Sequence, residues 1–214
     1  MDIIKHVYKW KGQLKKRVKT NYIILHHTGA KTGTVEGIHQ YHRDSRGWTG
    51  IGYNYVIYKD GTIHEGRGLE YVGAHATDYN SISVGISCVG DFNTEKMGKA
   101  QYDSLVWLIG FIKGYYPNAK ILGHKEVGNT ACPGKYYPLE DMKNFESIKK
   151  VDKENNDMER YKTLADVPES YKPTIQKLMQ EGVIKGKSGG IIDLTEDMCR
   201  TLVFVERMLN KEVK

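Results

Sequence analysis

Short apolar segments separated by polar and glycine-containing stretches are the feature that most constrains how this chain can fold. Runs of about four to eight apolar, β-branched and aromatic residues are typical of buried strands. Such segments lie at 22–25, 52–58 and 83–89, and a shorter one lies at 121–123. Because helical or irregular segments separate them, we expect a central mixed β-sheet flanked by helices, which is an α/β fold.

The segments between the strands indicate where the helices and turns lie. The longest expected helix covers 99–116, where apolar residues recur at helical spacing and Pro117 follows the end. A shorter helix is expected at 34–44. The Lys-Asp-Gly-Thr sequence at 59–62 predicts a hairpin turn with a return strand from Ile63. We expect the basic N-terminal segment, 1–20, to be an arm or a short strand.

Two histidines and a cysteine stand where expected strands end. His26 ends the first apolar segment, His124 follows the last one, and seven residues separate His124 from Cys132. Two imidazoles and a thiolate can hold Zn²⁺ and leave a fourth position open for water, as in hydrolytic sites. Adjacent strand residues point to opposite faces, so His26 and His27 should not both reach one ion, and periodicity does not say which does. The alternative is that these are ordinary packed histidines and an ordinary Cys-Pro-Gly turn.

The C-terminal part of the chain has a different character. Residues 151–163 are nearly all polar and predict a linker between a first domain, 1–150, and a second, 164–214. Helical patterns at 169–181 and 196–210 predict that the second domain is small and mainly helical.

The net charge of +6 belongs to the first domain. Residues 1–150 hold 21 Lys and Arg against 14 Asp and Glu, a balance of +7, whereas 151–214 hold 11 against 12, a balance of −1. A basic domain suits a polyanionic partner, either nucleic acid or an anionic cell wall, although it is equally compatible with a merely solvated surface. The basic residues form no nucleic-acid motif, so nucleic acid is the less favoured partner.

Cysteine usage and hydropathy bear on the compartment. Three cysteines at wide spacing do not form a disulfide framework, and we expect Cys88 and Cys199 to be buried small side chains. No segment approaches the ~18 apolar residues of a membrane span, and the N-terminus has no apolar core of a signal peptide. We therefore expect a protein made in the cytoplasm, with no membrane partner.

Four motifs in order resemble the type 2 N-acetylmuramoyl-L-alanine amidases, a family that includes phage lysozymes of the T7 kind and animal peptidoglycan recognition proteins. They are Trp-Thr-Gly-Ile-Gly-Tyr-Asn-Tyr-Val-Ile at 48–57, Asp-Gly-Thr-Ile-His-Glu-Gly-Arg-Gly at 60–68, Gly-Ala-His-Ala at 73–76 and Ser-Val-Gly-Ile-Ser-Cys-Val-Gly at 83–90. The resemblance runs from about residue 22 to 138. It implies the type 2 amidase fold and a bound Zn²⁺.

The resemblance also implies roles for individual residues. The zinc ligands would be His26, the first of the histidine pair, with His124 and Cys132. Tyr53 corresponds to the catalytic tyrosine of the family. Thr130 stands where catalytic recognition proteins have threonine and phage lysozymes of the T7 kind have lysine. Other branches place a catalytic glutamate where this chain has Ser87, so a mechanism based on glutamate is not expected.

The implied reaction is hydrolysis of the amide between N-acetylmuramic acid and L-alanine in peptidoglycan, with the oxyanion stabilised by zinc, Tyr53 and Thr130. Further matches predict a substrate groove. Its candidate residues are Tyr41, His42, Trp48, Arg67, His75 and Asn80. Two of them have alternatives, since Arg67 could form an ion pair that holds the hairpin and His75 could only orient the backbone. We expect the His27 side chain either to be packed in the interior or to lie behind the zinc ligands and support them.

The second domain shows a partial resemblance to a single S-layer-homology motif, carried by Leu-Ala-Asp-Val-Pro at 164–168 and by the spacing of Leu178, Gly182 and Gly186. Modules of this kind usually bind secondary cell-wall polymers with several copies. One copy therefore suggests association of separate chains into a homo-oligomer, or a variant wall-binding module. A helical appendage that packs on the first domain or only dimerises is the alternative.

These observations favour a phage or prophage endolysin that is stored in the host cytoplasm and lyses a Gram-positive cell wall. A host autolysin would share the chemistry. The competing hypotheses are a peptidoglycan-binding module without turnover, and a thiol hydrolase in which Cys132 is the nucleophile and His124 the base.

Overall fold

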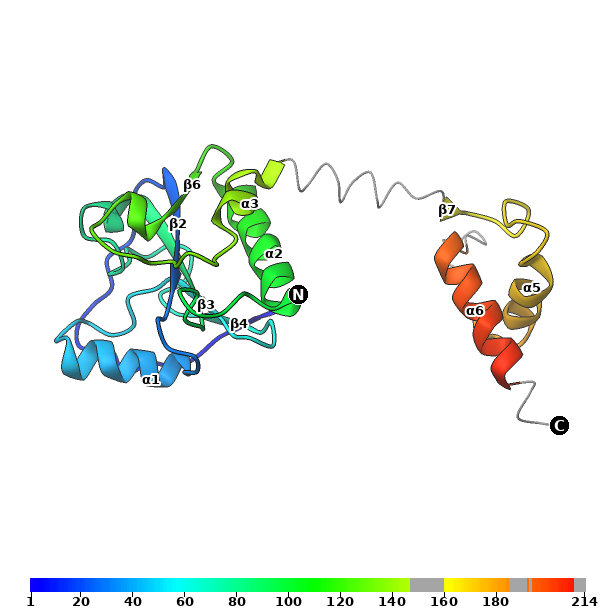
Figure 1. Cartoon of the computed structure of the whole chain (residues 1–214), viewed down its shortest axis with the longest axis horizontal. Helices are drawn as coiled ribbons and strands as arrows, with labels where there is room; N and C mark the ends of the chain where they lie inside the picture. The colour runs from blue at the N-terminus through cyan, green and yellow to red at the C-terminus, as the bar shows by residue number, and fades with distance from the viewer. Residues whose placement is uncertain (147–159, 185–191, 193, 210–214) are drawn as a thin grey trace. The chain divides into compact units, whose positions relative to one another are not determined.

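The computed structural model describes residues 1–146, 160–184, 192 and 194–209 (Figure 1). The chain divides into two compact units, Met1–Phe145 and Glu146–Lys214. The boundary predicted at residue 150 and most of the predicted linker lie outside the described residues. No helix within the described ranges is both long enough and apolar enough to cross a membrane.

A six-stranded sheet with the order β1-β4-β3-β5-β2-β6 forms the first unit. Its strands are β1 (Ile3–Ile4), β2 (Tyr22–His27), β3 (Tyr55–Ile57), β4 (Ile63–Glu65), β5 (Ser83–Cys88) and β6 (Lys120–Gly123). β2 pairs in parallel with both β5 and β6, whereas β3 and β4 are antiparallel. The sheet is therefore mixed, and the prediction of a mixed sheet with flanking helices is confirmed.

The interior position of β2, between β5 and β6, explains its apolar sequence. Ile23, Ile24 and Leu25 are all fully buried, as expected for a parallel strand covered on both faces. Register brings His26 opposite Ser87 of β5, and Leu25 opposite Gly123 at the end of β6. The carboxyl ends of three parallel strands thus meet at one edge of the sheet, which is where α/β folds usually place ligands.

Helix α2 (Lys99–Tyr115) matches the expected helix and buries one apolar face. Its fully buried residues are Leu105, Leu108, Ile109 and Ile112. The expected helix at 34–44 is divided into α1 (Val35–Gln40), whose N-cap Thr34 accepts a hydrogen bond from the Gly37 amide, and a π-helical turn η1 (Tyr41–Ser45). Two 3₁₀ segments, η2 (Thr77–Ile82) and η3 (His124–Glu126), and the short helix α3 (Leu139–Lys143) were not predicted.

The strand expected at 52–58 is shorter than predicted, because Gly52 bonds to a loop and to a side chain instead of continuing the ladder of β3. The Gly52 carbonyl accepts a hydrogen bond from the Ala74 amide, and the Gly52 amide donates to His42 Nδ1. A Cβ at Gly52 would lie 2.2 Å from the Ala74 oxygen, so only glycine fits this close approach.

The C-terminal unit contains a two-stranded sheet of β7 (Arg160–Tyr161) and β8 (Leu194–Thr195), with helices α5 (Lys172–Gln180) and α6 (Glu196–Leu209). Its core includes Tyr161, Val167, Ile175, Ile192, Leu194 and Cys199. β7 lies within 151–163, which the sequence predicted to be linker. The ordered fold of this unit thus begins before residue 164, because Tyr161 is one of its buried core residues.

Candidate active site

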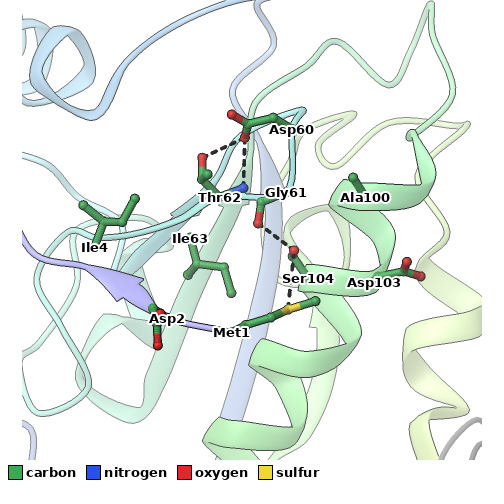
Figure 2. Close-up of a pocket in the computed structure, with 10 residues that line it drawn as sticks. All are labelled: Met1, Asp2, Ile4, Asp60, Gly61, Thr62, Ile63, Ala100, Asp103 and Ser104. Carbon is green, nitrogen blue, oxygen red and sulfur yellow. Dashed lines mark hydrogen bonds between the residues drawn. The ribbon is translucent and has the colours of Figure 1, made fainter. Parts of the chain in front are cut away.

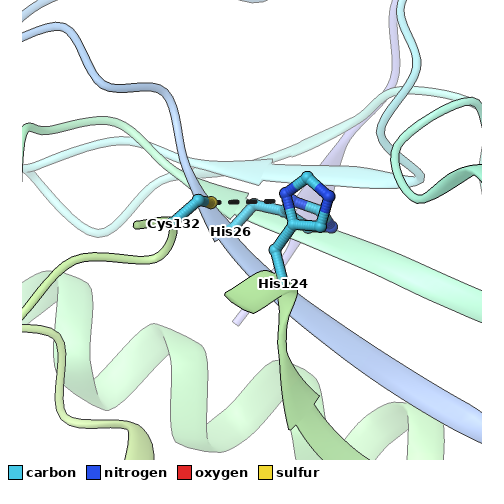
Figure 3. A group of neighbouring side chains, drawn as sticks. All are labelled: His26, His124 and Cys132. Carbon is cyan, nitrogen blue, oxygen red and sulfur yellow. Dashed lines mark hydrogen bonds between the residues drawn. The ribbon is translucent and has the colours of Figure 1, made fainter. Parts of the chain in front are cut away.

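His26, His124 and Cys132 converge at the carboxyl edge of the central strands. One ligand atom of each lies within 4.8 Å of the others, and the side chains point toward one another (Figure 3). His26 Nδ1 is 3.8 Å from Cys132 Sγ, and the rings of His26 and His124 are 4.5 Å apart between centroids. Within the described part of the chain this is the one such group of three.

Backbone hydrogen bonds fold the segment after β6 so that Cys132 returns to the site. The Lys125 amide donates to the Cys132 carbonyl at 2.7 Å, and the Cys132 amide donates to Thr130 Oγ1 at 3.1 Å. Gly134 has a φ of +106° and lies against the backbone of Phe92, where a Cβ would come within 2.5 Å of a carbonyl carbon. The glycine of the Cys-Pro-Gly sequence is therefore required by a close approach.

Strand alternation separates His26 from His27, as expected. The His27 ring packs on Phe92 and accepts a hydrogen bond from the Phe92 amide at Nδ1 (3.2 Å), away from the other ligand candidates. The His27 amide instead donates to Cys132 Sγ at 3.4 Å. An N–H directed at sulfur favours its thiolate form, so His27 contributes through its backbone while His26 contributes its ring.

Burial dominates the electrostatics of the three side chains. It lowers the pKa of His26 well below its usual value and also lowers that of His124, so both imidazoles are neutral and keep a lone pair for a metal. Burial raises the pKa of the Cys132 thiol to about 11 against the opposing effect of the His27 amide. A thiolate here therefore requires a cation as neighbour. Two neutral imidazoles and one thiolate are a donor set that could hold Zn²⁺.

Tyr53 lies beside this group, with its ring centroid 5.3 Å from that of His26. Desolvation, followed by the nearby Cys132, raises the pKa of the phenol to about 12, and the neighbouring Ser87 hydroxyl opposes that rise. At neutral pH the phenol therefore keeps its proton and can donate a hydrogen bond into the site.

A cavity of about 400 Å³ adjoins Tyr53 and extends between residues 28–34 and α1. Tyr41 and His42 line it together with Tyr53. His42 is held by the Gly52 amide, and its ring lies 4.7 Å from that of Trp48. Desolvation lowers the pKa of His42 to about 4, so its ring is neutral. Three of the predicted groove and catalytic side chains thus line this cavity, and Trp48 packs against one of them, His42.

Three other predicted groove residues bond mainly to the protein itself. Arg67 donates to the carbonyls of Ile51 (2.7 Å) and Val72 (2.8 Å) and, within the described residues, has no carboxylate at ion-pair distance. Asn80 Oδ1 accepts from the amides of His75 and Ala76. Their role in substrate binding stays a prediction.

His75 is buried behind His26, and its Nδ1 lies 3.0 Å from His26 Nε2. Sequence reasoning placed His75 in a loop near the substrate and did not predict this contact. Burial lowers the pKa of His75 to about 3, so this ring is also neutral.

Two further residues belong to the surroundings of the site: Asn54, which sequence reasoning missed, and Ser87, which stands where other branches of the family have a catalytic glutamate. Asn54 is fully buried; its Oδ1 accepts from the Gly85 amide of β5, and its Nδ2 donates to the carbonyls of Gly68 and Tyr71. It thereby ties β5 to the loop that follows β4. In the sequence, this role was indicated only by a polar amide side chain within an otherwise apolar segment. Ser87 Oγ, beside Tyr53, is the one buried side-chain oxygen or nitrogen without a hydrogen-bond partner among the described residues.

A larger cavity of about 600 Å³ lies where the N-terminus meets the hairpin and α2 (Figure 2). Its polar groups bond to each other or to neighbours, since Asp60 Oδ1 accepts from Thr62, Ser104 Oγ donates to the Gly61 carbonyl, and Asp103 pairs with Lys99. The cavity shares no residue with the site and offers no comparable group of ligands.

The fold and site define a mixed-sheet α/β protein with a His-His-Cys centre at the edge of the sheet. Residues 16–135 match the N-acetylmuramoyl-L-alanine amidase family Amidase_2, and the chain belongs to that family. Its resemblance to the type 2 amidases is thereby confirmed.

Individual relatives extend this result. Peptidoglycan-recognition protein SC2 of Drosophila melanogaster is 41% identical over 125 residues, which cover 53% of this chain and 68% of that protein. The endolysin of Enterobacteria phage K11 is 34% identical over 131 residues, covering 58% and 86%. Among solved structures, N-acetylmuramoyl-L-alanine amidase LysC from Clostridium intestinale superimposes with a TM-score of 0.65 at 37% identity, covering 67% of this chain and 96% of that one.

Proposed function

We propose that the chain is a zinc-dependent amidase that hydrolyses the bond between the lactyl group of N-acetylmuramic acid and L-alanine in peptidoglycan. The observation that carries the proposal is the convergence of His26, His124 and Cys132 within 4.8 Å beside Tyr53. The relatives support the substrate, since a structure of PGRP-LB, 32% identical to this chain, is a complex with tracheal cytotoxin, and PGRP-LE, 26% identical, is a complex with monomeric diaminopimelic acid-type peptidoglycan.

His26, His124 and Cys132 would hold the zinc ion. His124 is more exposed than His26, which leaves one side of the group open to substrate and water. Bound there, zinc would act as a Lewis acid that polarises the scissile carbonyl and makes the attacking water more acidic. The burial of His26 would strengthen this effect, because electrostatic interactions are stronger where water is excluded.

Tyr53 would donate its phenolic hydrogen to the oxygen that becomes negative as water adds to the carbonyl. Its raised pKa of about 12 suits this role, because the phenol stays protonated at neutral pH.

Thr130 would act as a second donor. Its oxygen already accepts a hydrogen bond from the Cys132 amide, which holds that oxygen in place, and its own hydrogen remains available.

A thiol mechanism is less well supported. A nucleophilic cysteine is normally activated by a lowered pKa, whereas burial raises that of Cys132 to about 11. A non-catalytic binding protein remains the main competitor, and turnover distinguishes it.

The proposed biological role is that of an endolysin acting on a Gram-positive wall after storage in the host cytoplasm. The endolysin relatives support this role, among them LysCS from Clostridium intestinale, with 37% identity and a TM-score of 0.65. The C-terminal unit would bind a secondary wall polymer and could associate with copies of itself. The +7 balance of residues 1–150 favours an anionic wall as the surface on which the enzyme works.

The test is release of soluble stem peptides with new N-terminal alanine from purified Gram-positive peptidoglycan. We expect release that is lost on chelation and restored by zinc. Activity that survives complete zinc removal would instead favour Cys132 as a nucleophile. Zinc binding without release from walls of several cross-bridge types would leave a recognition protein without turnover.

A further inference from the structure

We infer that His75 is a positioning residue that fixes the tautomer of His26. It holds the proton of His26 on Nε2, so that Nδ1 presents a lone pair to the metal position. The inference rests on the proposed zinc site but not on the proposed reaction. It follows from the positions of the protons in a line of hydrogen bonds that runs from Tyr79 in η2 through Ser83 and His75 to His26 in β2.

The line starts at Ser83, the first residue of β5. Ser83 Oγ lies 2.6 Å from the carbonyl oxygen of Tyr79, which can only accept, so the hydroxyl hydrogen is committed to that bond. Towards His75 the same oxygen can therefore only accept, and His75 Nε2 lies at 3.5 Å from it. The proton of a neutral His75 ring accordingly belongs on Nε2.

With its proton on Nε2, neutral His75 presents a lone pair at Nδ1. His26 Nε2 lies 3.0 Å from that atom, and two lone pairs would repel at this distance. His26 must therefore carry its proton on Nε2 and donate it to His75. Its Nδ1 is then unprotonated, and this is the atom that lies 3.8 Å from Cys132 Sγ on the ligand side.

This arrangement differs from the usual support of a metal-binding histidine. Such a ring normally donates its second N–H to a carboxylate, a backbone carbonyl or water. Here the acceptor is a second neutral imidazole, which fixes the tautomer without placing a negative charge behind the ligand.

The protein holds the His75 ring with very little freedom. A Cβ at Gly73 would lie 2.3 Å from His75 Cδ2, and a Cβ at Gly85 would lie 2.4 Å from the same atom. The ring therefore occupies space that only two glycines leave free. The His75 amide is also fixed, by Asn80 Oδ1 at 2.7 Å.

Asparagine and leucine at position 75 provide a matched test, because they have nearly the same shape and only asparagine offers an acceptor near the place of Nδ1. We expect His75→Leu to weaken zinc affinity by about 10- to 100-fold, the usual effect of losing a partner of a metal ligand. His75→Asn should keep most of the affinity. Competition with a chromophoric chelator in the full chain measures both, and denaturant unfolding of the metal-free variants shows whether both fold.

His64→Leu is the control, since it makes the same change at a buried histidine of β4 outside the site, and it should leave zinc affinity unchanged. Equal affinity in His75→Leu and the wild type would overturn the inference. So would equal weakening in the leucine and asparagine variants, because the acceptor would then be irrelevant.

Nitrogen-15 NMR of the imidazoles in the unaltered, zinc-loaded chain tests the tautomers directly, even if a variant fails to fold. We expect protons on Nε2 of both His26 and His75. A proton on His75 Nδ1 would contradict the inference. A chain with the expected tautomers that releases no alanine termini would overturn the proposed reaction and leave this inference intact.

Discussion

At the scale of single residues, the neighbours His26 and His27 show how far sequence reasoning reaches. Alternation along a strand predicts that only one ring faces the site, and the structure places His26 there and packs His27 on Phe92. The contact between His26 and His75 could not be predicted in the same way. It depends on a loop whose position is set by two glycines and by Asn80, which are far from His26 in sequence.

Ser87 allows a prediction about stability. Its buried hydroxyl has no hydrogen-bond partner among the described residues, and such a group costs about 1–3 kcal/mol. We expect Ser87→Ala to leave the free energy of unfolding unchanged or to raise it by about 1 kcal/mol. Ser83→Ala is the control and should lower it by about 1 kcal/mol, because the Ser83 hydroxyl donates to Tyr79. Denaturant unfolding of the metal-free proteins measures both. A clear fall in the free energy of unfolding of Ser87→Ala would contradict the prediction.

Tyr53 allows a prediction about activity. If its phenol stabilises the oxyanion, Tyr53→Phe should lower kcat by about 10²- to 10³-fold, as loss of one such donor usually does. Zinc affinity should stay the same, because the phenol is not among the ligand candidates. Alanine release and zinc titration measure the two quantities. The exposed Tyr136 gives a control, since Tyr136→Phe should change neither; near-normal kcat in Tyr53→Phe would exclude the proposed role.

At the scale of elements, apolar runs predicted the central strands well because a parallel strand buried on both faces has almost no polar residue to obscure it. The N-terminal β1 and helix α3 are too short to show periodicity. The turn η1 was expected to continue a regular helix; it is π-helical instead, and within it His42 is buried and accepts a hydrogen bond from the Gly52 amide, a contact that helical periodicity does not predict.

Two glycines in regular elements should respond oppositely to the same substitution. Gly85→Ala would place a Cβ 2.4 Å from His75 Cδ2, and overpacking of this kind costs about 1–3 kcal/mol. Gly114→Ala in α2 meets no atom within 4 Å and should stabilise the fold by about 0.5–1 kcal/mol through helix propensity. Denaturant unfolding measures both. An unchanged or raised free energy of unfolding in Gly85→Ala would show that the surroundings of His75 are not rigid.

At the scale of the whole molecule, the uneven charge and the polar segment after residue 150 predicted two parts with different tasks. A prediction about the second part follows. Deleting residues 151–214 should abolish binding to intact walls while leaving alanine release from soluble peptidoglycan fragments nearly unchanged, because every candidate ligand lies in Met1–Phe145. Cosedimentation with walls measures the first effect. Wall binding that survives the deletion would assign targeting to the first unit.

The histidines predict how the metal-free molecule responds to acid. Burial lowers the pKa of six of them from the usual 6.5, and the set consists of His26, His27, His42, His64, His75 and His124. Above about pH 6.5 these rings are neutral in both the folded and the unfolded chain, so they contribute no pH dependence. Below it the unfolded chain binds protons that the folded chain excludes, and the free energy of unfolding must fall as the pH falls.

Each such histidine contributes a slope of about 1.4 kcal/mol per pH unit between the unfolded and the folded pKa. For His42 and His75 this window extends down to about 4 and 3. Denaturant unfolding in the presence of chelator, from pH 7.5 to 4.5, should therefore show stability that is flat at first and then declines steeply below about 6.5. His42→Gln should make the decline shallower. A stability curve that stays level down to pH 5 would mean that these rings take up protons in the folded state, and the neutral, lone-pair-bearing site described here would then be wrong.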